Sequence, residues 1–158
     1  DKLLGMIADA QRKEIVKLAF GGVDKVRLDL FDLDGGTFTP TWKLQEIYQE
    51  QFPDVQIWHV VGGDIVAGGR DSNSEIHKIW DKGNEIWGSL NFAVIARPGY
   101  RVEKQDMPPS SELIEIERIV GSATMIRERI ANGESVDDLV TPAVADYINQ
   151  NRLYYSSK

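Results

Sequence analysis

The sequence predicts an α/β fold in which a parallel sheet carries helices on both faces. Two short apolar runs, 55–61 and 91–96, are rich in β-branched and aromatic residues, which is typical of buried strands. Helix-like segments with an apolar stripe stand before and between these runs. Because strands and helices alternate along the chain, we expect parallel strands joined by helical crossovers.

Composition indicates a globular protein of one domain, residues 1–158, with a core of its own. The net charge is −7 and the basic residues form no stripe, which argues against a nucleic-acid partner. No run approaches the roughly 18 apolar residues that span a membrane. The chain has no cysteine, which excludes thiolate catalysis and cysteine-based metal sites within it. We therefore expect a cytoplasmic protein without a membrane partner or a protein-bound metal.

The first part of the chain predicts two helices and one strand. Residues 1–20 carry a broken apolar stripe that ends at Gly21-Gly22, as a helix would. Residues 26–31 alternate between apolar and polar side chains and predict a strand. Thr39-Pro40 is a typical helix start and predicts a helix that continues to about Gln51.

Two further strands and a short helix follow. The run 55–61 predicts a buried strand, and 67–74 is rich in turn residues and predicts a flexible loop. Ser74 begins a short helix that reaches Trp80. Residues 91–96 predict a second buried strand, and the alternation over 112–120 predicts the last one.

Gly62-Gly63-Asp64 follows the strand 55–61 directly. Glycines at the carboxyl end of a strand allow a ligand to approach the backbone, and this edge is where open α/β sheets bind ligands. Asp64 is suited to hold the hydroxyls of a ribose. The alternative interpretation of the same three residues is a plain turn.

The last forty residues predict an anion site at the start of a helix. Ser122 is a good N-cap, Thr124 lies in the first turn, and Arg127 lies one turn further on. Free backbone N–H groups, the positive end of the helix dipole, two hydroxyls and a guanidinium would meet there. Phosphate is the usual occupant of such a place.

The same region predicts how the chain ends. Asn132-Gly133 is expected to stop the helix, and Ser135 to open a short turn of acidic helix. Thr141-Pro142 predicts a capped start for an amphipathic helix over 143–149.

Two C-terminal segments resemble nicotinate/nicotinamide mononucleotide adenylyltransferases. Residues 121–127 read Gly-Ser-Ala-Thr-Met-Ile-Arg, which is similar to the family motif I-S-S-T-x-x-R. Residues 144–154 read V-A-D-Y-I-N-Q-N-R-L-Y, which is similar to the family ending V-x-x-Y-I-x-x-N-x-L-Y. The motif departs from the family at Gly121 and Ala123, so that one hydroxyl is lost.

The resemblance implies a Rossmann-like nucleotidyltransferase fold whose first β-α-β unit is absent from these residues. Residues 12–19 resemble the R-x-x-M-L-x-L-A helix that lies in the middle of the family's chain. The family's earlier G-x-F-D-P-x-H-x-G-H motif does not occur in the sequence, and neither His59 nor His77 lies in an H-x-G-H arrangement. We therefore expect an N-terminally incomplete chain, whose activity alone is an open question.

The resemblance also suggests residues for the pyridine nucleotide. Ile79-Trp80 matches a pair that borders the pyridine ring, although Trp80 also fits a core position. Thr41 and Trp42 match the end of the family's Y-T-x-D-T-L segment, or simply cap and pack their helix. Arg97 opens an R-P-G sequence and is suited to a phosphate or a pyridine carboxylate, or equally to a surface ion pair.

The function implied is adenylyl transfer from ATP to nicotinate or nicotinamide mononucleotide in NAD biosynthesis, with Mg²⁺ as the cofactor that accompanies ATP. Arg127 is the expected catalytic residue, and with Ser122 and Thr124 it would hold the ATP phosphates. Gly62 and Asp64 would bind the nucleotide ribose or backbone. Two alternatives are a non-catalytic nucleotide-binding module and a relative with another phosphate acceptor. A homo-oligomer is compatible with either function.

Overall fold

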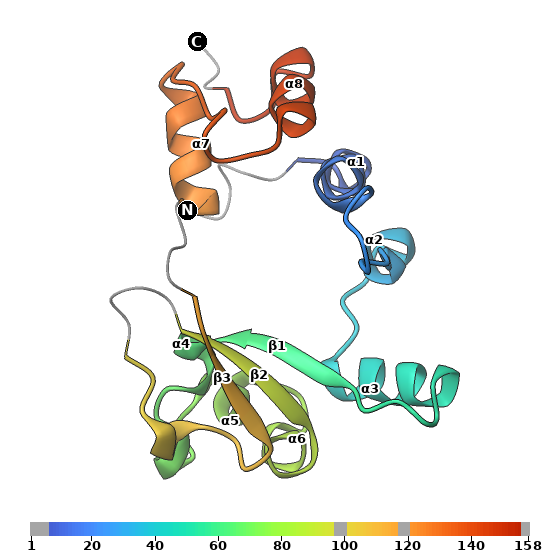
Figure 1. Ribbon diagram of the computed structural model, residues 1–158, viewed down its shortest axis with the longest axis vertical. Helices are drawn as coiled ribbons and strands as arrows, with labels where there is room; N and C mark the ends of the chain where they lie inside the picture. Colours follow the sequence, from blue (N-terminus) through green and yellow to red (C-terminus); the bar gives the residue numbers. More distant parts are fainter. Residues whose placement is uncertain (1–6, 97–100, 117–120, 156–158) are drawn as a thin grey trace. The chain divides into compact units, whose positions relative to one another are not determined.

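The computed structural model describes residues 7–96, 101–116 and 121–155, which fall into two compact units (Figure 1). One unit, called here the sheet unit, is Thr39–Ile119. The other, the helical unit, combines Asp1–Phe38 with Val120–Lys158. Each has a hydrophobic cluster of its own. The single domain expected over 1–158 stays a prediction.

The sheet unit contains a parallel sheet, as the sequence predicts, with three strands among the described residues. They are β1 (Trp58–Gly62), β2 (Asn91–Ala96) and β3 (Ser111–Glu115). β2 lies in the middle, with Val94 opposite Val61 on β1 and opposite Leu113 on β3. β2 has the predicted bounds, whereas β1 begins later than expected. The predicted strand over 112–120 is observed as β3, and 117–120 lies outside the described residues.

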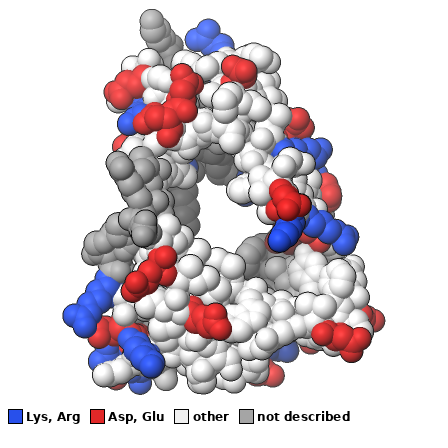
Figure 2. Space-filling model, in the orientation of Figure 1, with Lys and Arg blue, Asp and Glu red and all other residues white. Residues whose placement is uncertain are grey.

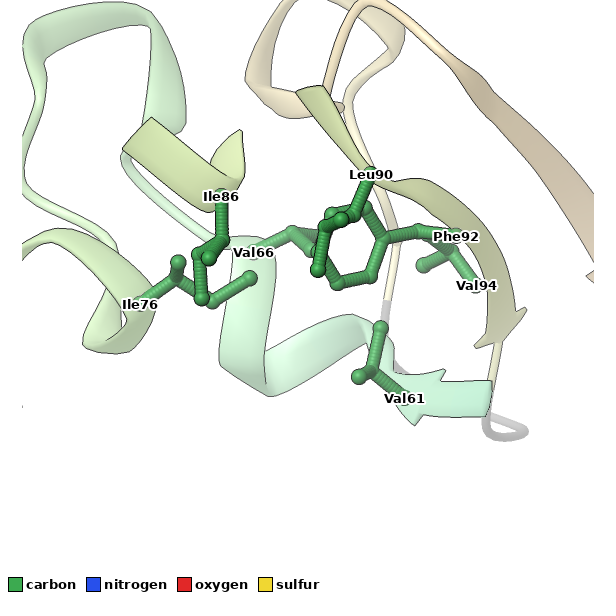
Figure 3. Close-up of a cluster of buried hydrophobic side chains, with 7 residues drawn as sticks. All are labelled: Val61, Val66, Ile76, Ile86, Leu90, Phe92 and Val94. Atoms are coloured by element: carbon green, nitrogen blue, oxygen red, sulfur yellow. The ribbon is translucent and has the colours of Figure 1, made fainter. Parts of the chain in front are cut away.

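One face of the sheet is buried against short helices of the same unit. These elements are α3 (Thr41–Gln51), α4 (Gly63–Val66), α5 (Glu75–Ile79), α6 (Gly83–Ser89) and the 3₁₀ turns η1 (Gly69–Asp71) and η2 (Lys104–Asp106). Phe92 and Val94 on β2 are fully buried in this core (Figure 3). Alternate residues of a strand point to opposite faces, and Val60, next to buried Val61, is 65% exposed. The sheet therefore has one well-packed face in this unit.

The helical unit is built from α1 (Asp9–Phe20), α2 (Phe31–Gly35), α7 (Ala123–Ala131) and α8 (Pro142–Gln150). Its buried cluster is formed by Ile130, Val136, Val144, Ile148 and Leu153. The amphipathic helix predicted over 143–149 is confirmed, because Val144 and Ile148 are both buried one turn apart. Thr141 caps α8 by accepting the Val144 N–H at 3.4 Å.

Three local predictions were wrong. The strand predicted over 26–31 is not observed, because 26–30 have no regular structure and Phe31 is the first residue of α2, where its N–H donates to Asp29 Oδ1 at 2.8 Å. Pro40 itself occupies the cap of α3, so Thr39 does not. Ser135 accepts the Asp137 N–H at 3.2 Å and starts a turn rather than a helix.

Acidic and basic side chains are interspersed on the surface, as Figure 2 shows for one face. The chain carries 25 acidic against 18 basic residues, so negative charge dominates. Across the described parts of the chain, no helix combines the length and the apolar character needed to cross a membrane.

Candidate functional site

The start of α7 brings Ser122, Thr124 and Arg127 together, as the sequence predicts. Ser122 has an extended backbone, and its hydroxyl oxygen accepts the Met125 N–H at 3.1 Å. Arg127 Nη2 donates to the Thr124 hydroxyl at 3.3 Å, which holds the guanidinium over the first turn. Both hydroxyl residues are exposed, and Arg127 is half-buried. The helix start therefore presents its polar groups to solvent.

Such a helix start attracts anions for two reasons. A helix supplies no backbone acceptor for its first N–H groups, and its aligned peptide dipoles place partial positive charge at the same end. A guanidinium adds a full positive charge with several donors. Phosphate oxygens satisfy both the donors and the charge. The role of Ser122, Thr124 and Arg127 in binding stays a prediction.

Tyr154 and Arg12 also belong to the surroundings of Arg127, and sequence reasoning missed both. Burial raises the pKa of the Tyr154 phenol, while the positive charges of Arg127 and Arg12 act to lower it. Arg12 lies on α1 and pairs with Asp9 at 3.2 Å, between Nη1 and Oδ1. Its position within the family-like segment 12–19 was the only available signal. Two guanidiniums thus act on one phenol within the helical unit.

Gly62 and Asp64 lie where β1 passes directly into α4. Gly62 ends the strand and caps the helix with an extended backbone, and Gly63 is buried as the first helical residue. Asp64 is exposed in the first turn of α4. The three residues are therefore a strand-to-helix junction rather than a plain turn, with an accessible carboxylate at the carboxyl end of a parallel strand.

Thr41 and the Ile79-Trp80 pair are connected through their neighbours. Thr41 is the first residue of α3, and the next residue, Trp42, donates its Nε1–H to Asp81 Oδ2 at 2.8 Å. Ile79 is 73% exposed at the end of α5, whereas Trp80 is half-buried and packs against the core of the sheet unit. The structure thus ties the two proposed pyridine-binding segments together. Arg97 lies outside the described residues.

An ion pair that spacing alone did not reveal holds the segment after α4. Arg70 Nε donates to Asp106 Oδ1 at 2.7 Å, Arg70 Nη2 donates to Oδ2 at 3.3 Å, and the Arg70 backbone N–H donates to Oδ1 at 3.3 Å. This fork holds the Asp106 pKa at about 2, mainly through the hydrogen bond from Arg70.

Packing around this pair is too tight for a side chain at Gly69. A Cβ there would lie 2.3 Å from the Asp106 carbonyl oxygen and 2.4 Å from the Trp87 ring. The loop predicted over 67–74 is observed between α4 and α5, and its flexibility stays a prediction. The loop contains η1 and is joined to η2 by the Arg70–Asp106 pair.

Both histidines have packing partners. His59 Nε2 lies 2.8 Å from Gln45 Oε1, and His77 Nδ1 lies 2.6 Å from the hydroxyl of fully buried Ser74. Burial lowers the pKa of both imidazoles. In residues 7–96, 101–116 and 121–155, no three His, Asp or Glu side chains group in a way that could hold a metal ion.

Comparison with known proteins gives a consistent set of relatives. Nicotinate-nucleotide adenylyltransferase from Escherichia coli is 31% identical over 166 aligned positions, covering 91% of this chain and 74% of the relative. The Bacillus subtilis protein of the same name is 26% identical, and the alignment covers 92% of this chain and 71% of the Bacillus subtilis chain.

Among solved structures, nicotinic acid mononucleotide adenylyltransferase of Plasmodium falciparum, complexed with NaAD, has a similar fold. The TM-score is 0.67 at 19% identity, with 94% of this chain and 74% of the other covered. No protein-family model matches the chain. The likeness agrees with the parallel α/β architecture of the sheet unit.

The Arg70–Asp106 pair predicts a specific pH dependence of stability. Because the folded pKa of Asp106 is depressed from 3.8 to about 2, the pair's contribution is complete above about pH 4 and is lost as the pH falls through about 2. Urea unfolding should therefore show the unmodified protein more stable than Asp106→Asn, with a difference that is largest above pH 4 and shrinks below it. Asp54→Asn, at an exposed position of the same unit, is the control. A difference that does not change with pH would contradict this assignment.

Proposed function

The chain belongs to the nicotinate-nucleotide adenylyltransferase family, and from this premise we propose that it transfers the adenylyl group of ATP to nicotinate or nicotinamide mononucleotide. The products would be the corresponding dinucleotide and pyrophosphate, a step of NAD biosynthesis. The sequence similarity to the Escherichia coli relative supports the reaction class, because it extends over nine-tenths of this chain.

The observation that carries the proposal is the exposed start of α7. Ser122, Thr124 and Arg127 converge there, with the Arg127 guanidinium 3.3 Å from the Thr124 hydroxyl. In a chain with a net charge of −7, a local group of cationic and N–H donors is needed to attract a triphosphate. We assign the ATP phosphates to this place.

The reaction itself needs placement and charge neutralisation more than proton transfer. An oxygen of the mononucleotide 5′-phosphate attacks the α-phosphorus of ATP, a new P–O bond forms, and the bond to the bridging oxygen breaks. The electron pair of that bond leaves with pyrophosphate. Donors that hold the phosphates favour this step by fixing the attack geometry and by opposing the charge that builds on the leaving group. Arg127 is the proposed catalytic residue because its charge is of the required sign.

Other residues would bind the remaining parts of the two substrates. Asp64 has an exposed carboxylate suited to ribose hydroxyls, and Gly62 allows close approach to the backbone. Ile79 and Trp80 would form an apolar wall for the pyridine ring, with Thr41 close by and Arg97 proposed for its charged groups. Mg²⁺ is proposed to enter with ATP. Phosphate oxygens of ATP would supply ligands to the ion, together with water.

A second candidate is a nucleotide-binding module without catalysis. It is favoured by the state of the two histidines, since His59 contacts Gln45 and His77 contacts Ser74 rather than an open site. Both candidates share the phosphate site at α7. A cytoplasmic location, without nucleic acid or membrane as a partner, and a possible homo-oligomer complete the proposal.

Pyrophosphate release distinguishes these functions. With ATP present, we expect release when nicotinate or nicotinamide mononucleotide is added, and none when phosphopantetheine is added, because the apolar wall at Ile79-Trp80 suits a flat ring. Release with phosphopantetheine alone would point to the relative with another acceptor. Release with none of the three, combined with measurable ATP binding, would contradict the enzyme and favour the binding module.

Arg127→Ala tests the phosphate site within this function. In a protein that includes the H-x-G-H segment, loss of the guanidinium should lower kcat by about tenfold or more, because transition-state charge loses a positive partner. Arg129→Ala is the matched control on the same helix, since Arg129 is occupied by Asp138 at 2.7 Å and should leave kcat within about twofold. Steady-state rates with ATP and nicotinate mononucleotide measure both. Equal rates for Arg127→Ala and the unmodified protein would refute the role.

A further inference from the structure

We propose that Trp42, Asp81 and Lys82, called here the indole clamp, position the Ile79-Trp80 pair and thereby set the affinity for the pyridine nucleotide. The inference rests on the proposed function, because it concerns the proposed pyridine wall of that same site. It assigns a positioning role to three residues that need not touch the ligand themselves.

The clamp holds the Trp42 indole from two directions. The indole N–H, which lies in the ring plane, donates to Asp81 Oδ2 at 2.8 Å. The Lys82 ammonium lies 3.7 Å from the ring centroid, over the face of the indole, where the negative π-cloud attracts a cation. Consecutive residues therefore bind the edge and the face of one side chain. Two different interactions fix the position of the segment 81–82 relative to the start of α3.

The backbone that carries Asp81 and Lys82 is a tight turn. Gly83 N–H donates to the Trp80 carbonyl at 3.1 Å, so Asp81 and Lys82 are its two central residues. Lys82 adopts a left-handed conformation with φ +56°, which is unfavourable for a lysine and persists only where surrounding contacts maintain it. A Cβ at Gly83 would lie 2.0 Å from the Ile76 carbonyl oxygen, so the end of this turn lies directly on α5.

The turn begins at Trp80, and so the clamp acts on the proposed wall through a single peptide unit. Trp42 and Trp80 also pack against the same core, which anchors both rings to the sheet unit. Ile79 remains 73% exposed beside them. An apolar side chain held in solvent by a constrained turn is suited to meet an apolar part of a ligand. The clamp would keep Ile79 and Trp80 in place before the ligand arrives, and preorganisation of this kind lowers the cost of binding.

The proposed ATP groups are on other elements. Gly62 and Asp64 follow β1, and Ser122, Thr124 and Arg127 start α7. Loss of the clamp contacts should therefore weaken binding of the pyridine nucleotide and leave ATP binding unchanged. A general loss of stability would affect both ligands, which makes the two explanations separable.

The test compares Trp42→Phe, Asp81→Ala and their double variant in the full chain, by titration calorimetry with nicotinate mononucleotide and, separately, ATP. Trp42→Phe keeps an aromatic ring in the core but removes the N–H donor. We expect each single variant to raise the Kd for nicotinate mononucleotide by about three- to tenfold, the equivalent of one lost hydrogen bond. The ATP Kd should stay within about twofold. The double variant should bind nicotinate mononucleotide no more weakly than either single variant, because the two substitutions remove the same contact.

Conservative and distant changes serve as controls. Asp81→Asn keeps an oxygen acceptor for the indole N–H and should restore most of the affinity. Lys82→Asn removes the ammonium at a position where asparagine tolerates the left-handed backbone, and it should weaken binding of the mononucleotide. Lys104→Gln changes an exposed cation on η2, outside the clamp, and should have no effect.

Each outcome decides between the clamp and the function. Equal weakening of ATP and mononucleotide, or additive effects in the double variant, would overturn the positioning role. If the unmodified protein binds the mononucleotide without turnover, the proposed reaction is wrong. The Kd values of the variants still test whether the clamp positions the Ile79-Trp80 pair. Where turnover is present, the clamp variants should raise the KM for the mononucleotide. Their kcat should stay within about twofold of that of the unmodified protein. Absence of mononucleotide binding in the unmodified protein would overturn the clamp, and ATP binding would then identify a different nucleotide module.

Discussion

The nucleotide binding that we propose depends on backbone N–H groups at the start of α7, for which the helix itself provides no acceptor. The Ser122 hydroxyl accepts the Met125 N–H, and the Arg127 guanidinium donates to the Thr124 hydroxyl. The helix cap and the positive charge therefore lie in the same exposed turn. Arg12 and Arg127 both act to lower the pKa of Tyr154. In a chain with a net charge of −7, the Arg127 guanidinium supplies positive charge at the turn where we propose that phosphate binds.

The sheet unit addresses a different requirement, which is to hold irregular segments still beside a rigid sheet. Loops that carry function gain precision when packing and hydrogen bonds fix them. Arg70 and Asp106 join the segment after α4 to η2 through a fork of hydrogen bonds. Trp42 and Asp81 join the start of α3 to the turn after α5. The Trp42–Asp81 contact joins residues adjacent in sequence to Thr41 and Trp80, so an interaction that stabilises the unit would also shape the proposed site.

The sequence predicted what depends on local pattern. β2, the cap of α7 at Ser122 and the start of α8 at Thr141-Pro142 all follow from apolar runs and capping residues a few positions apart. Residues 26–30 show where such patterns fail, because the Phe31 N–H donates to the Asp29 side chain, a bond of the kind that competes with strand pairing. The Arg70–Asp106 and Trp42–Asp81 contacts join residues 36 and 39 positions apart. Periodicity contains no information on such pairs, and a left-handed Lys82 has no sequence signal either.

The most direct measurement is a titration of ATP into ¹⁵N-labelled protein, followed through the backbone amide resonances. A phosphate bound at the start of α7 contacts the amide groups themselves, so their chemical shifts report the site without relying on turnover. We predict that the amides of Ser122 to Arg127 shift in a saturable manner. Saturable shifts elsewhere, with the α7 amides unchanged, would contradict the placement of the triphosphate and with it the central claim about this protein.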